Sequence, residues 1–197
     1  MSSKKTATVP TLSDRHNDLT RQLILGAALA ALEHATVGEL TVRAVAKHAN
    51  ISERTIFRYF PSREEFLDAI AEEVRLELDL PPFPGSIGDL LAAPRALYRR
   101  FEAKLNLTKA ALHSELFPRM RDTQAKRRWV AVCKVIDAHV PRRSERDRKL
   151  AAANIRYFLS ATTWHYYRFY FDFSLEETIA CAEIAIRQAI EGLGKRV

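Results

Sequence analysis

The chain has 197 residues, of which 47% are hydrophobic and 28% are charged, a balance typical of soluble globular proteins. No apolar run is long enough to span a membrane, no secretory signal begins the chain, and its two cysteines are too few for a disulfide framework or a zinc site. We therefore expect a cytoplasmic protein without a metal or other cofactor. The formal net charge of +7 favours polyanionic partners but does not identify one.

Helix-forming residues dominate the chain, and glycine is scarce, with only six. Residues 1–12 are polar and lack periodicity, which predicts a flexible tail. A first helix should begin at Ser13, a good N-cap. Two short helices, over residues 41–48 and 52–60, should follow, and a fourth should open at Ser62. The predicted apolar positions of the first helix are Leu19, Leu23, Ala27 and Ala31.

Prolines divide the remaining residues into further helices, because proline lacks an N–H donor and clashes with the preceding turn. Ser144 should begin a long helix that runs to about Tyr170, and Ser174 should cap the last one. No segment alternates as a strand does, so the sequence predicts an all-α protein with about nine helices. The prolines expected to begin, kink or end a helix are those of PPFPG at 81–85, Pro94, Pro118 and Pro141.

The two short helices have the dimensions of a helix-turn-helix. Ala46 and Ala49 are small where the helices must cross closely. Asn50 is the kind of non-glycine residue that best adopts the left-handed conformation of a tight turn. Ser52 can cap the second helix. The residues predicted to form a small core with the first helix are Val45, Ile51, Ile56 and Phe60.

Burying one side of the second short helix leaves Arg54, Phe57 and Arg58 facing solvent. Taken singly, either arginine is best explained as part of a solvated surface. With the cap and the turn in register, the three favour a surface that reads the major groove of DNA. There arginine can contact guanine, and apolar groups can contact the methyl group of thymine.

Residues 40–70, LTVRAVAKHANISERTIFRYFPSREEFLDAI, resemble the N-terminal domain of the TetR family of bacterial transcription regulators. The similarity covers about residues 15–70. It implies a DNA-binding domain over residues 13–66, with its helix-turn-helix at about 41–60. It also implies a C-terminal ligand-binding and dimerisation domain over residues 67–197.

The resemblance assigns DNA contacts by position. Thr41 and Arg43 would touch the DNA backbone, and Tyr59 and Arg63 would hold phosphates. The remaining assigned residues are the cap Ser52, the phosphate-binding Arg58, and Glu53, Arg54, Thr55 and Phe57, which would face base edges.

Three positions depart from the family pattern. Asn50 and Thr36 stand where the family usually has glycine, in the turn and after the first helix respectively. Phe57 replaces the common tyrosine and lacks its hydroxyl. We expect these changes to alter the preferred operator rather than to abolish DNA binding.

The C-terminal helices leave two interpretations open. Residues 154–173 are rich in aromatic side chains, and the last helix carries an apolar stripe. Both features suit a plain monomeric core or a four-helix bundle with a second subunit, formed by helices at about 144–171 and 174–193. The resemblance implies the homodimer. The residues of the apolar stripe are Leu175, Ile179, Ala182, Ile186, Ala189 and Leu193.

A ligand site would lie among the middle helices. The basic stretch at 119–149 is best explained as a solvated surface. The alternative is that its positive charge attracts an anionic ligand such as an acyl-coenzyme A. The effector could thus be apolar, aromatic or of acyl type. The residues expected to line its site are Phe101, Trp129, Cys133, Thr162 and His165.

We therefore predict a homodimeric, ligand-responsive regulator, more specifically a repressor, of a palindromic double-stranded DNA operator. Its ligand would shift the fourth helix, at about 62–78. One alternative is a DNA-binding factor without a small-molecule ligand, either architectural or partner-dependent. The other is an enzyme on a helical scaffold, but no phosphate-binding loop, nucleophile elbow or carboxylate pair supports catalysis.

Overall fold

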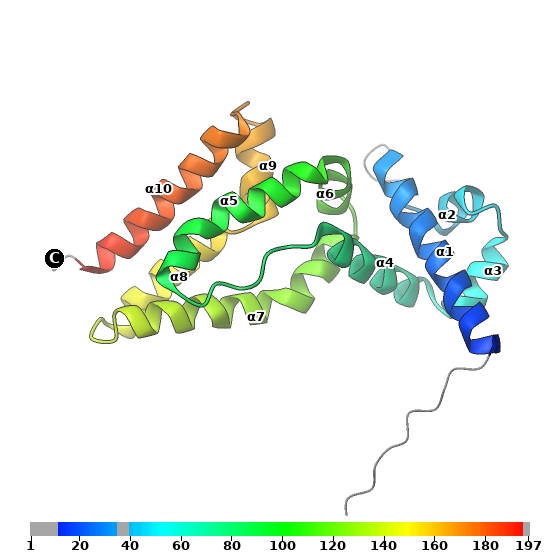
Figure 1. The fold of residues 1–197 in the computed structure, drawn as a ribbon, viewed down its shortest axis with the longest axis horizontal. Coiled ribbons are helices and arrows are strands. Elements are labelled where there is room, and N and C mark those ends of the chain that lie inside the picture. Colours follow the sequence, from blue (N-terminus) through cyan, green and yellow to red (C-terminus); the bar gives the residue numbers. More distant parts are fainter. Residues whose placement is uncertain (1–11, 35–39, 195–197) are drawn as a thin grey trace, which may run out of the picture.

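The computed structural model describes residues 12–34 and 40–194, and these residues form ten helices and no strand (Figure 1). The all-α prediction is confirmed, with one helix more than the nine or so expected. The predicted tail lies outside the described residues except for Leu12, and so does Thr36. None of the described helices is both long and apolar enough to cross a membrane.

Three helices form a small N-terminal domain, at the right of Figure 1. They are α1 (Leu12–His34), α2 (Val42–His48) and α3 (Glu53–Tyr59). The predicted core with the first helix is confirmed, since Val45, Ile56 and Phe60 are fully or almost fully buried and Ile51 packs against them. Their main partners on α1 are Ile24, Leu25, Ala28 and Leu32.

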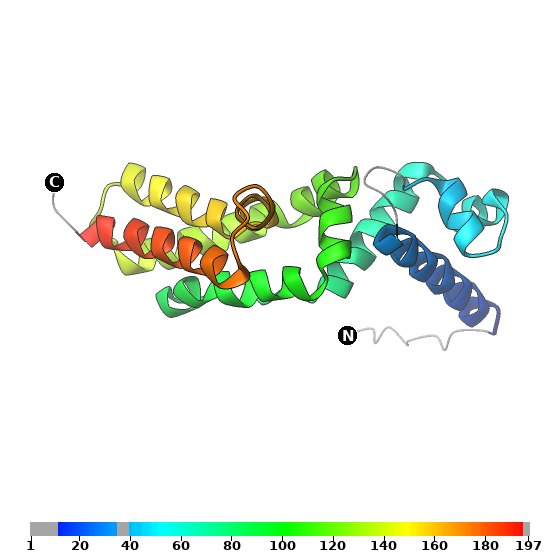
Figure 2. The ribbon, with the colours of Figure 1, turned by 90° about the horizontal axis from the view of Figure 1, so that it is seen from above.

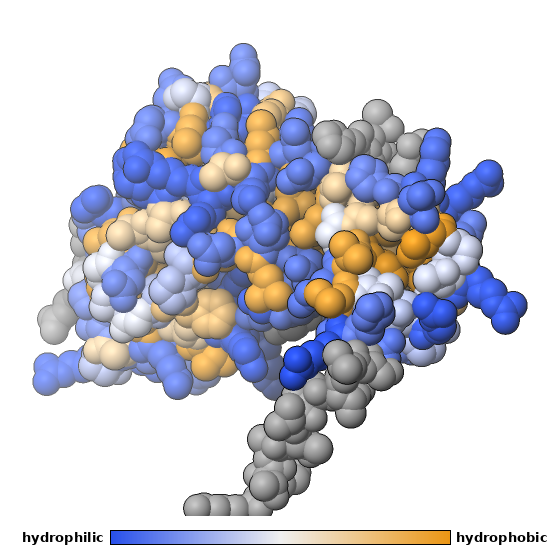
Figure 3. Space-filling view, turned by 45° about the vertical axis from the view of Figure 1, so that its right-hand side comes forward, coloured by the Kyte–Doolittle hydropathy of each residue, from blue (hydrophilic) through white to orange (hydrophobic). Residues whose placement is uncertain are grey.

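The predicted apolar face of α1 is wrong by about one residue. Leu19 and Leu23 are 58% and 72% exposed, whereas Ile24 and Ala28 are buried. Both sets have helical spacing, and packing against the other helices decides which one turns inward. Figure 3 shows apolar residues at the surface of the N-terminal part, on the face brought forward there.

Helix α4 (Arg63–Leu78) lies between this domain and the rest of the molecule (Figure 1). Ser62 caps it as predicted, accepting a hydrogen bond from the Glu65 N–H at 3.1 Å. Its buried residues share one core with α1–α3, with α6 and with the start of α7. The six buried residues of α4 are Phe66, Leu67, Ile70, Ala71, Val74 and Leu78.

The C-terminal domain is a bundle of six helices. Pro94 neither begins nor ends a helix but is buried inside α5, while Pro118 lies in the first turn of α7, where proline is tolerated. A second core, with Tyr98, Trp164 and Ile186 among its fully buried members, holds this bundle together. The helices are α5 (Ile87–Ala103), α6 (Leu105–Leu112), α7 (Leu116–His139), α8 (Glu145–Phe158), α9 (Ala161–Phe169) and α10 (Leu175–Gly194).

The predicted single helix from Ser144 to about Tyr170 is wrong, because it breaks at Ser160. Ser160 has an extended backbone, with φ −140° and ψ 152°, and its hydroxyl accepts a hydrogen bond from the Thr163 N–H at 3.2 Å. It therefore begins a new helix as an N-cap. Figure 2 shows α9 end-on, whereas α8 and α10 are seen along their length.

A pair of histidines joins α6 to α9. The Nε2 atoms of His113 and His165 lie 3.1 Å apart, and Lys109 and Phe169 pack nearby. Burial lowers the pKa of His165, and the charges of His113 and Lys109 lower it further. The folded protein thus resists protonation of His165, which is free to protonate in the unfolded chain below about pH 6.5.

We predict that this pair makes folding stability fall with acidification. The unfolded state binds more protons as pH drops below about 6.5, so stability decreases there until the folded pKa is passed. His165→Phe keeps the ring contacts and should flatten the dependence of the urea midpoint on pH between about 7 and 5. The exposed His139, changed to Gln, is the control. Equal slopes in wild type and His165→Phe would contradict the prediction.

Candidate DNA interface and ligand cavity

The turn between α2 and α3 follows from local hydrogen bonds. Thr41 caps α2 by accepting from the Ala44 N–H at 3.1 Å. At the other end, the Ile51 N–H donates to the Ala46 carbonyl at 3.0 Å and the Asn50 N–H to the Lys47 carbonyl at 3.2 Å. This is the Schellman arrangement, which requires a left-handed residue after the C-cap. Asn50 supplies it with φ 54°, as predicted.

Ser52 fixes the start of α3. Its hydroxyl accepts from the Thr55 N–H at 3.1 Å and lies 2.8 Å from the Thr55 hydroxyl. Thr55 is half-buried, and its hydroxyl is engaged with the Ser52 cap. The cap fixes where α3 begins, and the fully buried Ile56 fixes which side of α3 faces the core.

The outer side of α3 exposes most of the residues that were assigned to DNA. Glu53, Arg54 and Arg58 are exposed, and 41% of Phe57 is exposed. On α2, Thr41 and Arg43 are exposed as well. The starts of α2 and α3 and the outer face of α3 thus form a polar, basic and partly aromatic surface. Side chains of these kinds contact phosphates and base edges in protein–DNA complexes.

Tyr59 lies at the edge of this surface. Its side chain is half-buried, and hydrogen bonds from Thr20 and Arg58 lower the pKa of its hydroxyl. Sequence reasoning missed Arg21, whose guanidinium donates to the Tyr59 carbonyl at 3.2 Å and stacks 4.3 Å from the ring centre of Phe60. Arg21 therefore holds the end of α3 from α1. No local pattern could reveal a contact between residues so far apart in the sequence.

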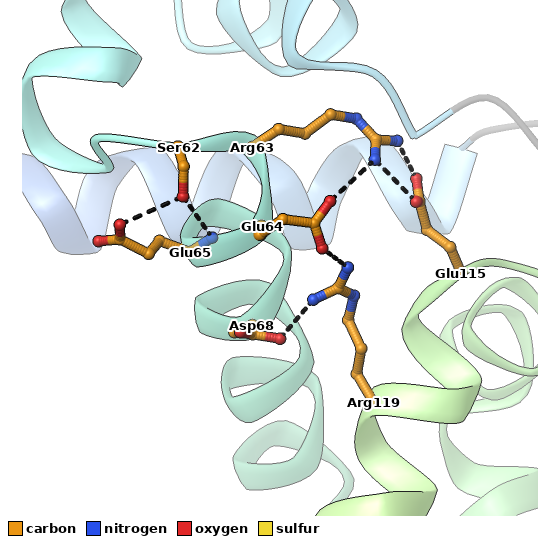
Figure 4. Close-up of polar contacts among 7 residues, drawn as sticks. All are labelled: Ser62, Arg63, Glu64, Glu65, Asp68, Glu115 and Arg119. Carbon is orange, nitrogen blue, oxygen red and sulfur yellow. Dashed lines mark hydrogen bonds and ion pairs between the residues drawn. The ribbon is translucent and has the colours of Figure 1, made fainter.

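Arg63 does not present a free guanidinium to DNA. Both of its terminal nitrogens bind the Glu115 carboxylate just before α7, one of them at 2.9 Å (Figure 4). Arg119 of α7 in turn binds Glu64 and, at 2.6 Å, Asp68. These five residues form an ionic junction between α4 and α7. A phosphate contact by Arg63 would require it to leave Glu115.

A cavity of about 540 Å³ lies in the C-terminal domain, within the usual size range of small-molecule sites. Three of the five predicted ligand-binding residues line it, Phe101, Trp129 and Thr162. Cys133 does not, because it packs against the second core, where burial raises the pKa of its thiol. His165 also lies outside the lining and pairs with His113 instead.

Most basic side chains at 119–149 are exposed, as a solvated surface predicts, but several are half-buried. Arg119 belongs to the ionic junction, and Arg148 binds Asp137 at 2.7 Å. Arg128 lines the cavity. The alternative that this stretch attracts an anionic ligand therefore has a location in the structure.

Comparison with known families decides the class of the protein. Residues 24–70 match the model of a family described as bacterial regulatory proteins, tetR family. The N-terminal part of the chain is thus that of a tetR-family regulator. The matched residues include the whole helix-turn-helix and the first half of α4, so the exposed side of α3 belongs to a DNA-binding transcriptional regulator. No curated protein sequence matches the chain.

We predict that Arg54 reads a base of the tetR-type operator. Arg54→Ala should weaken binding to the preferred operator by about 1–3 kcal/mol and relax specificity at one position of each half-site. The helix content should not change, since the side chain is exposed. Arg146→Ala, which removes an exposed arginine from the first turn of α8, is the matched control. Uniform weakening on all DNA sequences would instead assign Arg54 to a phosphate.

Proposed function

We propose that the protein is a ligand-responsive transcriptional repressor that binds a palindromic operator as a homodimer. The observation that carries this proposal is a continuous connection from the cavity to the DNA-reading surface. Helix α7 begins at the ionic junction, where Arg119 joins it to α4, and it lines the cavity further along with Trp129.

The connection offers a route for coupling. A ligand that displaces α7 pulls on Glu64 and Asp68, which lie in the first two turns of α4. Because α4 shares its core with α1–α3, its start cannot move without moving the DNA-reading surface. In a dimer this would alter the separation of the two recognition helices, which must match about one turn of DNA, ~34–36 Å.

The exposed sides of α8 and α10 suit a subunit interface. These helices pack against each other and lie side by side in Figures 1 and 2. Leu150 and Tyr157 on α8 are 53% and 60% exposed, and Ile184 on α10 is 55% exposed with Ala180 one turn before it. Large apolar side chains exposed together favour association with a partner.

The apolar stripe predicted along α10 is not this interface. Ile179, Ala182 and Ile186 are fully buried in the core of their own subunit. The monomeric-core interpretation therefore holds for the stripe itself. Pairing between subunits would use the opposite side of α10, around Ile184.

A DNA-binding factor without a small-molecule ligand is the alternative. A sealed C-terminal core would favour it, whereas a cavity of about 540 Å³ beside Phe101 and Trp129 favours a ligand-responsive regulator.

Selection of bound sequences from random duplex DNA tests the proposal. The wild-type chain should recover an inverted repeat, with affinity that falls steeply as salt rises. Ile184→Asp should remain helical but become monomeric in light scattering and lose most operator affinity, because a charge would be buried at the interface. Glu191→Asp, exposed on the same helix, is the control. Recovery of unpaired single sites by a wild-type monomer would contradict the dimeric repressor.

We predict that the ionic junction carries the ligand signal. Glu64→Gln combined with Asp68→Asn should leave operator binding without effector intact. In the wild type we expect the effector to weaken operator binding by about 5–150-fold, and in the double variant the logarithm of that factor should fall by more than half. The measurement is operator affinity with and without effector. Glu73→Gln, on the same helix but outside the junction, is the control. Unchanged coupling in the double variant would show that α4 responds by another route.

A further inference from the structure

The cavity has an unusual charge balance. Most of its wall is apolar, and its charged members are all arginines, with no aspartate or glutamate among the described residues that line it. The arginines come from three helices, α4, α7 and α8. They are Arg75, Arg121, Arg128 and Arg156.

Two of these arginines already have carboxylate partners. Arg75 binds Glu72 on its own helix at 2.5 Å, and Arg121 lies 3.4 Å from Asp122. Both partners neutralise their arginine from outside the cavity lining. Arg75 and Arg121 are therefore not the groups that most need an anion.

Arg128 and Arg156 are different. Both are half-buried, and neither has a carboxylate within 4.0 Å in the described part of the chain. The only hydrogen bond that the structure gives the Arg156 guanidinium is to the Leu159 carbonyl, at 2.8 Å. A second groove that Arg128 lines also contains Glu72 and Asp79, but Glu72 binds Arg75 and Asp79 binds Arg100 at 2.8 Å.

The two guanidinium groups also oppose each other. Burial lowers the pKa of Arg128 to about 10, and the positive charges of Arg156 and Arg75 contribute to that shift. Burial lowers the pKa of Arg156 as well. Like charges held half-buried on facing helices cost free energy unless an anion accompanies them. Paired guanidinium groups match the flat fork of a carboxylate or the oxygens of a phosphate.

The apolar wall defines the other end of the ligand. Leu78, Leu112, Phe117 and Met120 line the cavity together with Trp129. A small hydrophilic anion would leave these side chains against water, and a neutral apolar molecule would leave the arginines without a counterion. Only a molecule with both parts satisfies the whole lining.

We propose that the effector is an amphipathic anion, with an apolar body against the wall of the cavity and a carboxylate or phosphate head group bound by Arg128 and Arg156. This rests on the proposed ligand-responsive function, and it adds the chemical class of the ligand. The head group would bridge α7 and α8, and α7 leads to the ionic junction.

Calorimetry with four probes of equal chain length tests the class. The probes are decanoate, decyl phosphate, decanol and decyltrimethylammonium, used below their micelle concentrations. Tryptophan fluorescence is a second signal, because Trp129 lines the cavity. We expect decanoate or decyl phosphate to bind at least about tenfold more tightly than decanol, and the cation to bind most weakly. The preferred anion identifies the head group.

Variants locate the head group. Arg128→Gln and Arg156→Gln should each weaken the preferred anion at least about tenfold, leave decanol unchanged, and raise the melting temperature of the free protein by removing an uncompensated charge. Arg127→Gln, on the same helix but exposed and outside the cavity lining, makes the same change in net charge and should leave all three quantities unchanged. A purely structural role for either arginine would lower the melting temperature instead.

Two results would overturn the proposal. One is equal affinity for decanol and the anions, with no effect of the arginine variants; the cavity would then remain a ligand site for neutral molecules. The other is no binding of any probe. The proposed repressor function is tested by a different experiment, the selection of operator sequences. If no operator is selected by protein that still binds decanoate, the repressor function fails while the ligand proposal stands.

Discussion

The burial of α4 on two sides is the constraint on which the rest of the molecule depends. Phe66 and Ile70 pack toward the N-terminal helices, and the same core continues to Leu107 of α6 and Leu116 of α7. Close-packed interiors do not deform gradually, so α4 can change position only by repacking both neighbours together. The N-terminal helices and the C-terminal bundle are therefore mechanically coupled at this helix, although the family match covers only residues 24–70.

The helix-turn-helix could be predicted from the sequence because the contacts that form it are local. Thr41 and Ser52 cap helices through residues three positions ahead, and Asn50 adopts the left-handed turn within the same short segment. Such contacts leave a signature in a window of a few residues. The all-α class and the bounds of α4 followed from equally local signals, the prolines and the serine caps.

Contacts between distant residues could not be predicted in this way. The inward face of α1 depends on which helices cover it, so Leu19 and Leu23 were misplaced. The residues next to Arg63 do not reveal its partner Glu115. Helical spacing alone does not say which side of α7 faces the cavity, so the placement of Cys133 there is wrong. The break at Ser160 was missed because a serine inside an apolar helix is also common.

The Arg63–Glu115 pair has a consequence for the thermodynamics of operator binding. An arginine that meets a DNA phosphate normally displaces a condensed cation into solution, and this release produces the dependence of affinity on salt. To contact a DNA phosphate, Arg63 would have to leave the Glu115 carboxylate. Glu115 would then bind a cation from solution. The uptake of that cation offsets the release from DNA. If Arg63 contacts a phosphate, a count of basic residues on the surface would therefore overstate the salt dependence of operator binding.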